Sequence, residues 1–308
     1  MGRLSARLSL VALAACALVA FPATARADYV AATQGSLTMT SDPGDWVGQG
    51  QSYSLATPDD TFLTHGDATY FDGNMLVVQV SGPGESWYLG FQAPTGQRLT
   101  SGVTYANAIR GLQSSPPPGS QPRMDIFGDG RGCNTLTGSF TVLDVTYGPY
   151  GYLQSFHVTF EQHCEGATPA LRGELNVVAP PAPTAQSVHL TIDPSGVAAR
   201  PSGTAVVSGT ISCALPFTAY LNVFVTQPTK KGSVTGSATS VEVPCSGPSP
   251  TAWSATVPPD GKTAFTAGPA QVQVSTSAFD DYYTQYLGQN PIYASDSQTA
   301  TTQLRLPH

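Results

Sequence analysis

The chain has 308 residues, of which 41% are hydrophobic and only 11% are charged. This apolar content excludes a disordered chain, and the scarcity of Glu, Lys and Arg excludes a coiled coil. The formal net charge of −7 argues against a nucleic-acid partner, because proteins that bind nucleic acids carry a basic stripe. The length predicts two domains.

The N-terminus has the parts of a secretory signal peptide, which we place at residues 1–27. Arg3 and Arg7 supply the positive start, and a run of apolar residues follows them. Ala25 and Ala27 then supply small side chains at the two positions that a signal peptidase must accommodate. Cleavage after Ala27 predicts a secreted, extracellular protein.

A second interpretation of this segment stays open. Leu13-Ala14-Ala15-Cys16 resembles a bacterial lipobox, which would make Cys16 a lipid-anchored N-terminus. Apolar residues continue as far as Phe21, which favours Cys16 as one small residue inside the apolar run of a signal peptide. Beyond this segment no stretch reaches about 18 apolar residues, so we expect no membrane span.

The next region, residues 28–178, has the alternation of apolar and polar residues that is typical of half-buried strands. Leu37 and Met39 share one face of a predicted strand, and two further alternating runs lie at 76–80 and 87–91. Two long runs, 139–147 and 152–163, flank Gly148-Pro149-Tyr150-Gly151 and predict a hairpin. We expect a larger N-terminal β-sandwich or jelly-roll-like domain.

Four cysteines remain after the leader, and an even number in an exported chain predicts disulfides. Three pairings are possible, and we expect Cys133–Cys164 and Cys213–Cys245 because a linker separates the two couples. The hairpin supports the first pair: paired residues should have numbers that sum to about 299, and Cys133 and Cys164 sum to 297. No CxxC or His-rich spacing suggests a metal site.

Residues 179–186 are rich in proline and predict an extended linker. After it, residues 187–308 alternate with a period of two, with turn residues between the runs. This pattern predicts an immunoglobulin-like β-sandwich of seven strands. We place these strands at 188–194, 203–213, 218–227, 235–245, 251–258, 269–279 and 297–306.

Two stretches carry a resemblance. GDGRGCNTLTGSFTVLDVTYGPYGYLQSFHVTFEQHCEG, followed by PALRGELNV, looks like a module of uncharacterised exported bacterial proteins. The strands that end at Cys213 and Cys245, with the Trp253-Ser254-Ala255 strand after them, resemble bacterial immunoglobulin-like surface domains. These resemblances imply β-sandwiches and a location outside the cell. They imply no activity and no functional residue.

The search for catalytic or metal-binding residues finds only weak candidates, so we expect no cofactor and no metal. His157, Glu161 and His163 share one face of a strand, but such a face is more simply a solvated polar surface. Several carboxylates stand beside Gly or Pro, where Asp usually forms turns, although calcium or glycosidase chemistry would use the same groups. These loop carboxylates are Asp42, Asp45, Asp59, Asp60, Asp125 and Asp129.

Aromatic residues in predicted loops are the remaining lead, because exposed rings serve as platforms for sugars. We single out Trp46, Tyr150, Tyr282, Tyr283 and Tyr286 as candidate ligand contacts, the last three in a long loop over 280–296. The partner would be a carbohydrate or a cell-surface protein. The sequence therefore predicts an exported, non-catalytic binding or adhesion-type protein. The alternative is a secreted hydrolase of polysaccharides that uses the loop carboxylates of the N-terminal domain.

Overall fold

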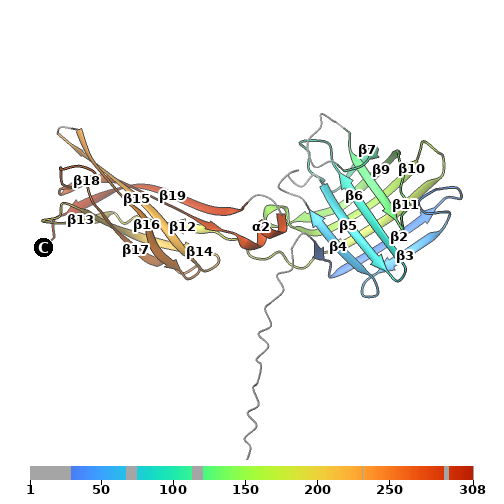
Figure 1. The fold of residues 1–308 in the computed structure, drawn as a ribbon, viewed down its shortest axis with the longest axis horizontal. Helices are drawn as coiled ribbons and strands as arrows, with labels where there is room; N and C mark the ends of the chain where they lie inside the picture. The colour runs from blue at the N-terminus through green and yellow to red at the C-terminus, as the bar shows by residue number, and fades with distance from the viewer. Residues whose placement is uncertain (1–28, 67–74, 113–120, 231, 288–290, 308) are drawn as a thin grey trace, which may run out of the picture.

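The computed structural model describes residues 29–66, 75–112, 121–230, 232–287 and 291–307. Strands make up 62% of the structure and helix only 4%, so the predicted all-β class is confirmed. Two β-sandwich units lie end to end along the long axis (Figure 1). The expected signal peptide and Cys16 fall outside the described residues.

The first unit is built on one sheet of eleven strands, in the order β1-β4-β5-β6-β8-β7-β9-β10-β11-β2-β3. The runs expected at Leu37, at 76–80 and at 87–91 are strands β2, β5 and β6, and their apolar faces are buried. The strands are β1 (Val30–Ala31), β2 (Gln34–Ser41), β3 (Ser52–Ala56), β4 (Thr61–Gly66), β5 (Met75–Gly82), β6 (Glu85–Gln92), β7 (Val103–Arg110), β8 (Arg123–Gly128), β9 (Leu136–Tyr147), β10 (Leu153–Cys164) and β11 (Ala170–Val178).

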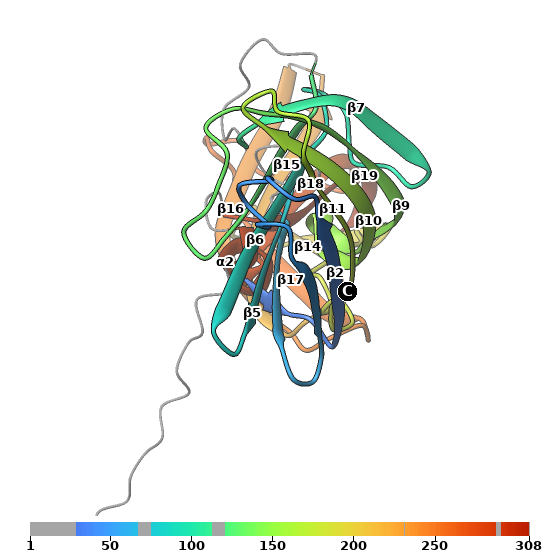
Figure 2. The ribbon, with the colours of Figure 1, turned by 90° about the vertical axis from the view of Figure 1, so that its right-hand side faces the viewer.

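This sheet folds over onto itself, so that both layers of the sandwich belong to one continuous sheet. Phe91 on β6 packs against Phe140 on β9 and Phe156 on β10, with ring centroids 5.2 and 5.6 Å apart, although other strands separate β6 from β9 and β10. Seen end-on, β5 and β6 form one layer and β9 and β10 face them (Figure 2). The folded sheet encloses a single apolar core.

The predicted hairpin is confirmed as β9 and β10, joined by the short 3-10 turn η1 (Pro149–Gly151). In most of the ladder the residue numbers of each pair add up to 300, as for Phe140 and Phe160, which is one more than expected. Cys164 lies opposite Leu136, so Cys133 precedes the start of β9 rather than facing its partner in the ladder. The Cys133–Cys164 disulfide closes the end of the hairpin.

The second unit has eight strands, one more than expected, in the order β12-β14-β13-β19-β18-β15-β16, with β17 paired to β14. Of the strand expected at 188–194, only its first three residues form one, β12, and after a bend at Pro194 an unpredicted strand, β13, follows at 195–198. Strand β13 pairs with β14 and runs parallel to β19, so it links the two layers. The strands are β12 (Val188–Leu190), β13 (Ser195–Ala198), β14 (Ala205–Cys213), β15 (Phe217–Thr229), β16 (Gly232–Cys245), β17 (Thr251–Val257), β18 (Gly268–Phe279) and β19 (Tyr293–Arg305).

The core of this unit lies between the β14–β17 layer and the β15–β18–β19 layer, as in an immunoglobulin-like sandwich. Trp253 is 2% exposed, and its indole N–H donates to the carbonyl oxygens of Thr191 and Thr210, which satisfies the one polar atom of the buried ring. The Cys213–Cys245 disulfide joins the ends of β14 and β16, as predicted.

A helix replaces part of the loop expected at 280–296. Helix α2 (Asp281–Leu287) begins where the Asp280 carboxylate accepts a hydrogen bond from the backbone N–H of Tyr283 at 3.1 Å. The other oxygen of Asp280 accepts from the N–H of Gln186 at 2.7 Å, which ties the helix to the linker. Within the described part of the chain, no helix is long and apolar enough to cross a membrane.

Candidate functional site

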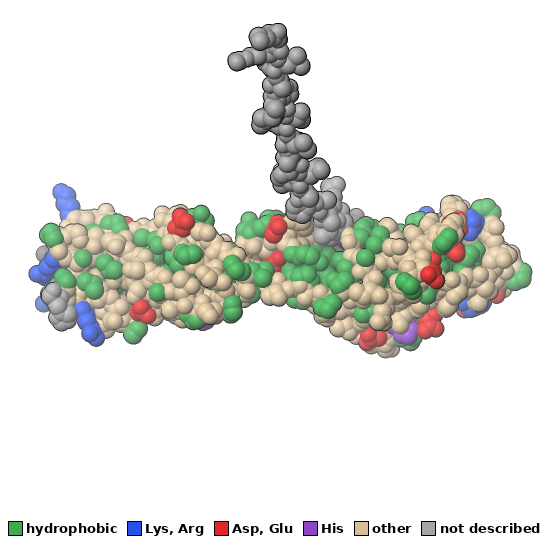
Figure 3. Space-filling view, turned by 90° about the horizontal axis from the view of Figure 1, so that it is seen from below, with side chains coloured by type: hydrophobic (Ala, Val, Ile, Leu, Met, Phe, Trp, Pro, Cys, Tyr) green, Lys and Arg blue, Asp and Glu red, His purple; other side chains and the backbone are tan. Residues whose placement is uncertain are grey.

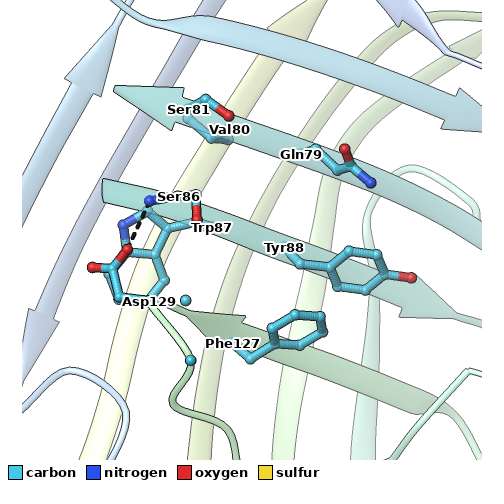
Figure 4. A pocket seen from close by; sticks show the side chains of 10 residues that line it. Gln79, Val80, Ser81, Ser86, Trp87, Tyr88, Phe127 and Asp129 are labelled. Carbon is cyan, nitrogen blue, oxygen red and sulfur yellow. Dashed lines mark hydrogen bonds between the residues drawn. The ribbon is translucent and has the colours of Figure 1, made fainter. Parts of the chain in front are cut away.

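The best candidate site is a pocket of about 340 Å³ on the outer face of the first unit. It lies over β5, β6 and the end of β8, on the side of the sheet that faces away from the core (Figure 4). Its lining combines aromatic rings with amide, hydroxyl and carboxylate groups. The lining residues are Gln79, Val80, Ser81, Ser86, Trp87, Tyr88, Phe127, Gly128, Asp129 and Gly130.

Strand alternation puts two aromatic rings on this outer face. Trp87 and Ile126 point into the core, so their neighbours Tyr88 and Phe127 point outward. Tyr88 and Phe127 lie directly opposite each other on β6 and β8, and their rings stack with centroids 4.6 Å apart at 16°. Phe127 remains 38% exposed, so the pair presents an open apolar surface.

Polar groups flank this pair of rings. Gln79 lies opposite Tyr88 on β5, and its amide donates a hydrogen bond to the hydroxyl of Tyr29 at 3.0 Å. Burial raises the pKa of Tyr88 to about 12, with further contributions from Tyr29 and from Asp125. The Tyr88 hydroxyl therefore keeps its proton at neutral pH and remains able to donate a hydrogen bond.

A tight turn closes one end of the pocket. Gly128 must lack a side chain, because a Cβ there would lie 2.5 Å from the ring of Trp87. Asp129 adopts a left-handed backbone with φ of 48°, and its carboxylate accepts a hydrogen bond from the backbone N–H of Ser86 at 2.9 Å. The guanidinium of Arg131 lies 3.6 Å from the same carboxylate. The glycine-rich motif at 128–132 thus shapes this turn.

The structure brings the turn that carries Trp46 next to the turn that closes the pocket. Trp46 is 59% exposed between β2 and β3. The buried carboxylate of Asp45 holds its turn by accepting from the backbone N–H of Gly48 at 2.6 Å. Arg131 donates to the carbonyl oxygen of Val47 at 2.9 Å and so links this turn to Asp129. The ligand role of Trp46 stays a prediction.

The four predicted tyrosines lie elsewhere, at the junction of the two units. Tyr283 and Tyr286 on α2 are 0% and 1% exposed, so they have no free surface for a ligand. Tyr282 is partly buried in the same cluster. Tyr150 is 38% exposed, and its ring centroid lies 5.1 Å from that of Tyr283. The expected role of Tyr283 and Tyr286 in binding does not fit this burial, because the rings form a small third core.

This third core, which we call the tyrosine joint, packs α2 and the linker against the first unit. Tyr286 receives a hydrogen bond from the backbone N–H of Leu153 at 3.4 Å, and Tyr283 donates to the carbonyl oxygen of Pro183 at 2.6 Å. The linker is therefore fixed by contacts with both units. Hydrophobic side chains gather at this junction on the face shown in Figure 3. The buried members are Tyr152, Ala179, Tyr283 and Tyr286.

Several loop carboxylates are engaged in local hydrogen bonds. Asp60 accepts from the backbone N–H of Ala56 at 2.7 Å, in the way that Asp45 and Asp129 hold their own turns. Asp42 accepts from the backbone N–H of Ala170 and from Arg172, and both hydrogen bonds lower the pKa of its carboxyl group. These groups stabilise turns, which is the commoner use of Asp beside Gly or Pro.

The expected polar face of β10 is present and forms ion pairs. His157 lies 2.7 Å from Glu174, and Glu161 contacts both His163 at 3.0 Å and Arg172 at 2.7 Å. The hydrogen bonds from His163 and then Arg172 lower the pKa of Glu161. Among the residues that the structure describes, no group of three or more His, Cys, Asp or Glu side chains is placed to hold a metal ion.

Sequence reasoning missed Tyr88 and Phe127, although the signal was present. Tyr88 lies between two buried positions of the strand predicted at 87–91, so its outward direction followed from that strand. Phe127 also lies between two buried positions, but its strand, β8, was not predicted, because Asp125 and Asp129 were assigned to loops. Their pairing across β6 and β8 did not follow, because residues 93–122 separate the two strands in sequence. A scan against protein-family models and a search of curated proteins found no match to this chain.

Proposed function

We propose that this chain is a non-catalytic binding protein, and that the Tyr88–Phe127 pocket receives a carbohydrate. The observation that carries the proposal is an exposed, stacked ring pair with amide, hydroxyl and carboxylate groups around it. A sugar ring has apolar C–H faces and a rim of hydroxyl groups. The aromatic surface suits the faces, and Gln79, Ser81 and Asp129 suit the rim.

The spacing of two loop carboxylates of the first unit, Asp125 and Asp129, favours binding over hydrolysis by this pair. A glycosidase needs two carboxyl groups roughly 5 to 9.5 Å apart on either side of the sugar. Asp125 and Asp129 are the acidic residues of β8 and its turn. They are four positions apart along a nearly extended chain, which separates them by roughly 10 Å or more. Asp129 is also engaged with Ser86 and Arg131. The polysaccharide hydrolase remains the alternative.

The last part of the proposal is the location of the protein outside the cell. Two disulfides within the described chain fit an oxidising environment outside the cytosol, because the reducing cytosol normally keeps thiols unpaired. Together with the leader at 1–27, they support a secreted protein, with lipid anchoring at Cys16 as the alternative. The kinship of the second unit with bacterial surface domains is part of this proposal, since an elongated two-unit protein suits display outside a cell.

The test is binding of the secreted form to a panel of neutral oligosaccharides and polysaccharides, measured by calorimetry. Phe127→Ala should weaken binding about three- to tenfold, because the sugar loses half of its stacking surface. The matched control is Phe224→Ala, which removes a similarly exposed ring, 46% exposed, from the second unit. The control should bind like the unaltered protein.

Two results would contradict the proposal. One is a panel in which no carbohydrate binds the unaltered protein. The other is a Phe127→Ala variant that keeps full affinity while Phe224→Ala loses it. Capture of a cell-surface protein through Phe127, with no carbohydrate bound, would favour a protein partner at the same pocket.

A further inference from the structure

The cations of the second unit gather at one end of the sandwich. Figure 3 shows Lys and Arg side chains at the end farthest from the first unit, and few along the rest of this unit. The described members are Arg200, Lys230, Lys262 and Arg305, all exposed. We call this end the basic pole.

The strand register explains why these four residues meet at one end. Lys230 follows Thr229, which pairs with Gly232 at the tip of the β15–β16 hairpin. Arg305 lies at the end of β19, opposite Val197 on β13, and Arg200 is two residues beyond the end of β13.

The remaining loop is joined to the same end by hydrogen bonds. Lys262 lies in the loop after β17, and in this loop the backbone N–H of Phe265 donates to the carbonyl oxygen of Gly203 at 3.0 Å. Asp260 of the same loop donates its backbone N–H to Thr235 on β16 at 2.8 Å. Four separate segments therefore each contribute one of the described cations to a common surface.

These cations are free of internal partners. Within the described residues, none of the four forms an ion pair, whereas Arg110, Arg131 and Arg172 in the first unit all do. Among the acidic side chains that the structure describes, Asp260 is the one that lies at the pole, and it accepts a hydrogen bond from the hydroxyl of Thr235 at 2.8 Å.

The other acidic side chains of the second unit lie away from the pole. Asp280 and Asp281 are at α2, and Asp296 bonds to the backbone N–H of Leu190 near the start of the unit. Glu242 lies opposite Tyr220 in the half of the β15–β16 pair nearer the joint, and Asp193 accepts from Ser208. The charges of this unit are therefore segregated along its long axis.

We propose that the basic pole is a docking surface for an anionic polysaccharide. In a chain of net charge −7, a polyanion is repelled by most of the surface and attracted only where unpaired cations cluster. Carboxylate or sulfate groups spaced along a sugar chain can contact cations that come from separate loops. Each such contact releases counterions, so the affinity should fall steeply with salt.

Two other polyanionic partners fit less well. A single-stranded nucleic acid needs aromatic platforms for its bases, but Phe265, the aromatic residue in the Lys262 loop, is only 3% exposed. A lipid surface needs apolar side chains that enter it, and the exposed large apolar residue near the pole is Leu306. A hydrated sugar polymer requires neither feature.

The consequence is an end-on orientation. The basic pole lies at the opposite end of the second unit from the tyrosine joint, and the first unit lies beyond the joint (Figure 1). A protein docked by the pole therefore holds the Tyr88–Phe127 pocket away from the polymer. This proposal does not depend on what the pocket binds, since the two sites are on different units.

The test measures binding of the secreted form to immobilised heparin and polygalacturonate over a range of salt concentrations. Neutral dextran is the negative surface. We expect retention on at least one polyanion at low salt, with affinity that falls as a power of salt concentration. The double variant Lys230→Gln/Lys262→Gln should bind about tenfold more weakly and reduce the slope of that log–log dependence by about one to two.

The matched control is Glu242→Gln, which makes the net charge less negative by one but lies away from the pole. It should bind like the unaltered protein, because position and not total charge decides the contact. Polygalacturonate carries carboxylates alone and heparin carries sulfates as well, so the difference between the two arms reports on sulfate. Failure of the unaltered protein to bind either polymer, or equal binding by the double variant, would overturn the proposal. Tighter binding to single-stranded DNA or to phosphatidylglycerol vesicles would also overturn it.

Discussion

The two units of this protein use their cationic side chains in opposite ways. In the first unit each arginine of the described chain has an internal partner: Arg98 lies 4.1 Å from the ring of Tyr147, Arg131 links two turns, and Arg172 bridges two carboxylates. In the second unit the described cations have no such partners and collect at the basic pole. A cation held inside a fold stabilises that fold, whereas a cation without a partner is available to another molecule.

The difference follows from how each unit is built. The folded sheet of the first unit must fix long connections around its core, and charged side chains join those connections to one another. The second unit is a regular sandwich with alternating strands, and its core needs no ion pairs to hold the loops. Because its described Lys and Arg side chains form no ion pair, we expect them to be dispensable for folding, so that stability alone does not explain why they gather at one end.

The largest expected effect is the loss of folding stability when either disulfide is removed, and the two bridges can be compared directly. Their sequence separations are nearly equal, 31 and 32 residues, so loss of either bridge should cost about 3.7 kcal/mol by the loop-entropy model. Replacing Cys133 and Cys164 by serine should lower the thermal transition of the first unit. The corresponding change at Cys213 and Cys245 should lower that of the second. Calorimetry of each variant, with the other as its control, measures both effects.

If both variants lowered a single common transition by the same amount, the units would unfold as one body. The comparison between two separately built units would then fail. Two transitions that move independently would support it.

The next effect concerns the joint between the units. Tyr283→Ala removes a ring that is 0% exposed and should cost about 3 kcal/mol, in the range for buried aromatic residues. It should also separate the unfolding of the two units, because α2 and the linker lose their main contact. The control Tyr283→Phe keeps the ring and loses only the 2.6 Å hydrogen bond to Pro183, at about 1 kcal/mol. Equal losses in the two variants would mean that packing at the joint matters little.

The local sequence pattern predicted the class and several of the strands, but not the long-range geometry. Alternation placed β2, β5, β6 and the β9–β10 hairpin, because the direction of each side chain depends only on its neighbours in the strand. The alternation of apolar and polar residues does not show how far a sheet curls, so the contact of Phe91 with Phe140 could not be predicted from it. The register of the hairpin was predicted to within one, since a turn fixes it locally.

The candidate site shows the same limit. In a helix, Tyr282, Tyr283 and Tyr286 lie on one side and can be buried together, whereas in a loop they need not be. The sequence analysis assigned this segment to a loop. The cap that starts α2 depends on Asp280, whose second oxygen binds the linker residue Gln186, and that contact is tertiary. The pairing of Tyr88 with Phe127 also depends on strand order, which one sequence did not determine.

A smaller effect tests the contrast between cations directly. Arg131→Ala removes the link from Val47 to Asp129 and should cost the first unit about 1 kcal/mol, since its side chain is partly buried. Lys262→Ala in the second unit should change stability by less than about 0.5 kcal/mol, because no internal partner is lost. Urea unfolding of both variants gives the comparison. A loss at Lys262 as large as that at Arg131 would refute the claim that the pole cations are dispensable for folding.

The smallest expected effect is a loss of folding stability at low pH, which we expect mainly in the first unit. Asp42, Glu161 and Glu165 all lie there, and hydrogen bonds to their charged forms lower the pKa of each: from Ala170 for Asp42, from His163 for Glu161 and from Asn134 for Glu165. A lowered pKa in the folded state means that the stabilisation is complete above the ordinary values of 3.8 and 4.5 and is lost as the pH falls through the lowered ones. The effect is small because all three groups are at the surface, where water screens them.

The measurement is thermal unfolding of the first unit between pH 7 and pH 2, with Arg172→Gln as the matched variant. Arg172 donates to both Asp42 and Glu161, so its loss should raise the pKa of each toward the ordinary value and flatten the acid dependence. Glutamine keeps the first three carbons of the side chain and a terminal amide but removes the charge, so we expect the strand β11 to stay intact. An acid dependence that stays unchanged in Arg172→Gln would show that the Ala170, His163 and Asn134 hydrogen bonds alone set these pKa values. The arginine would then contribute to the first unit no more than the pole cations contribute to the second.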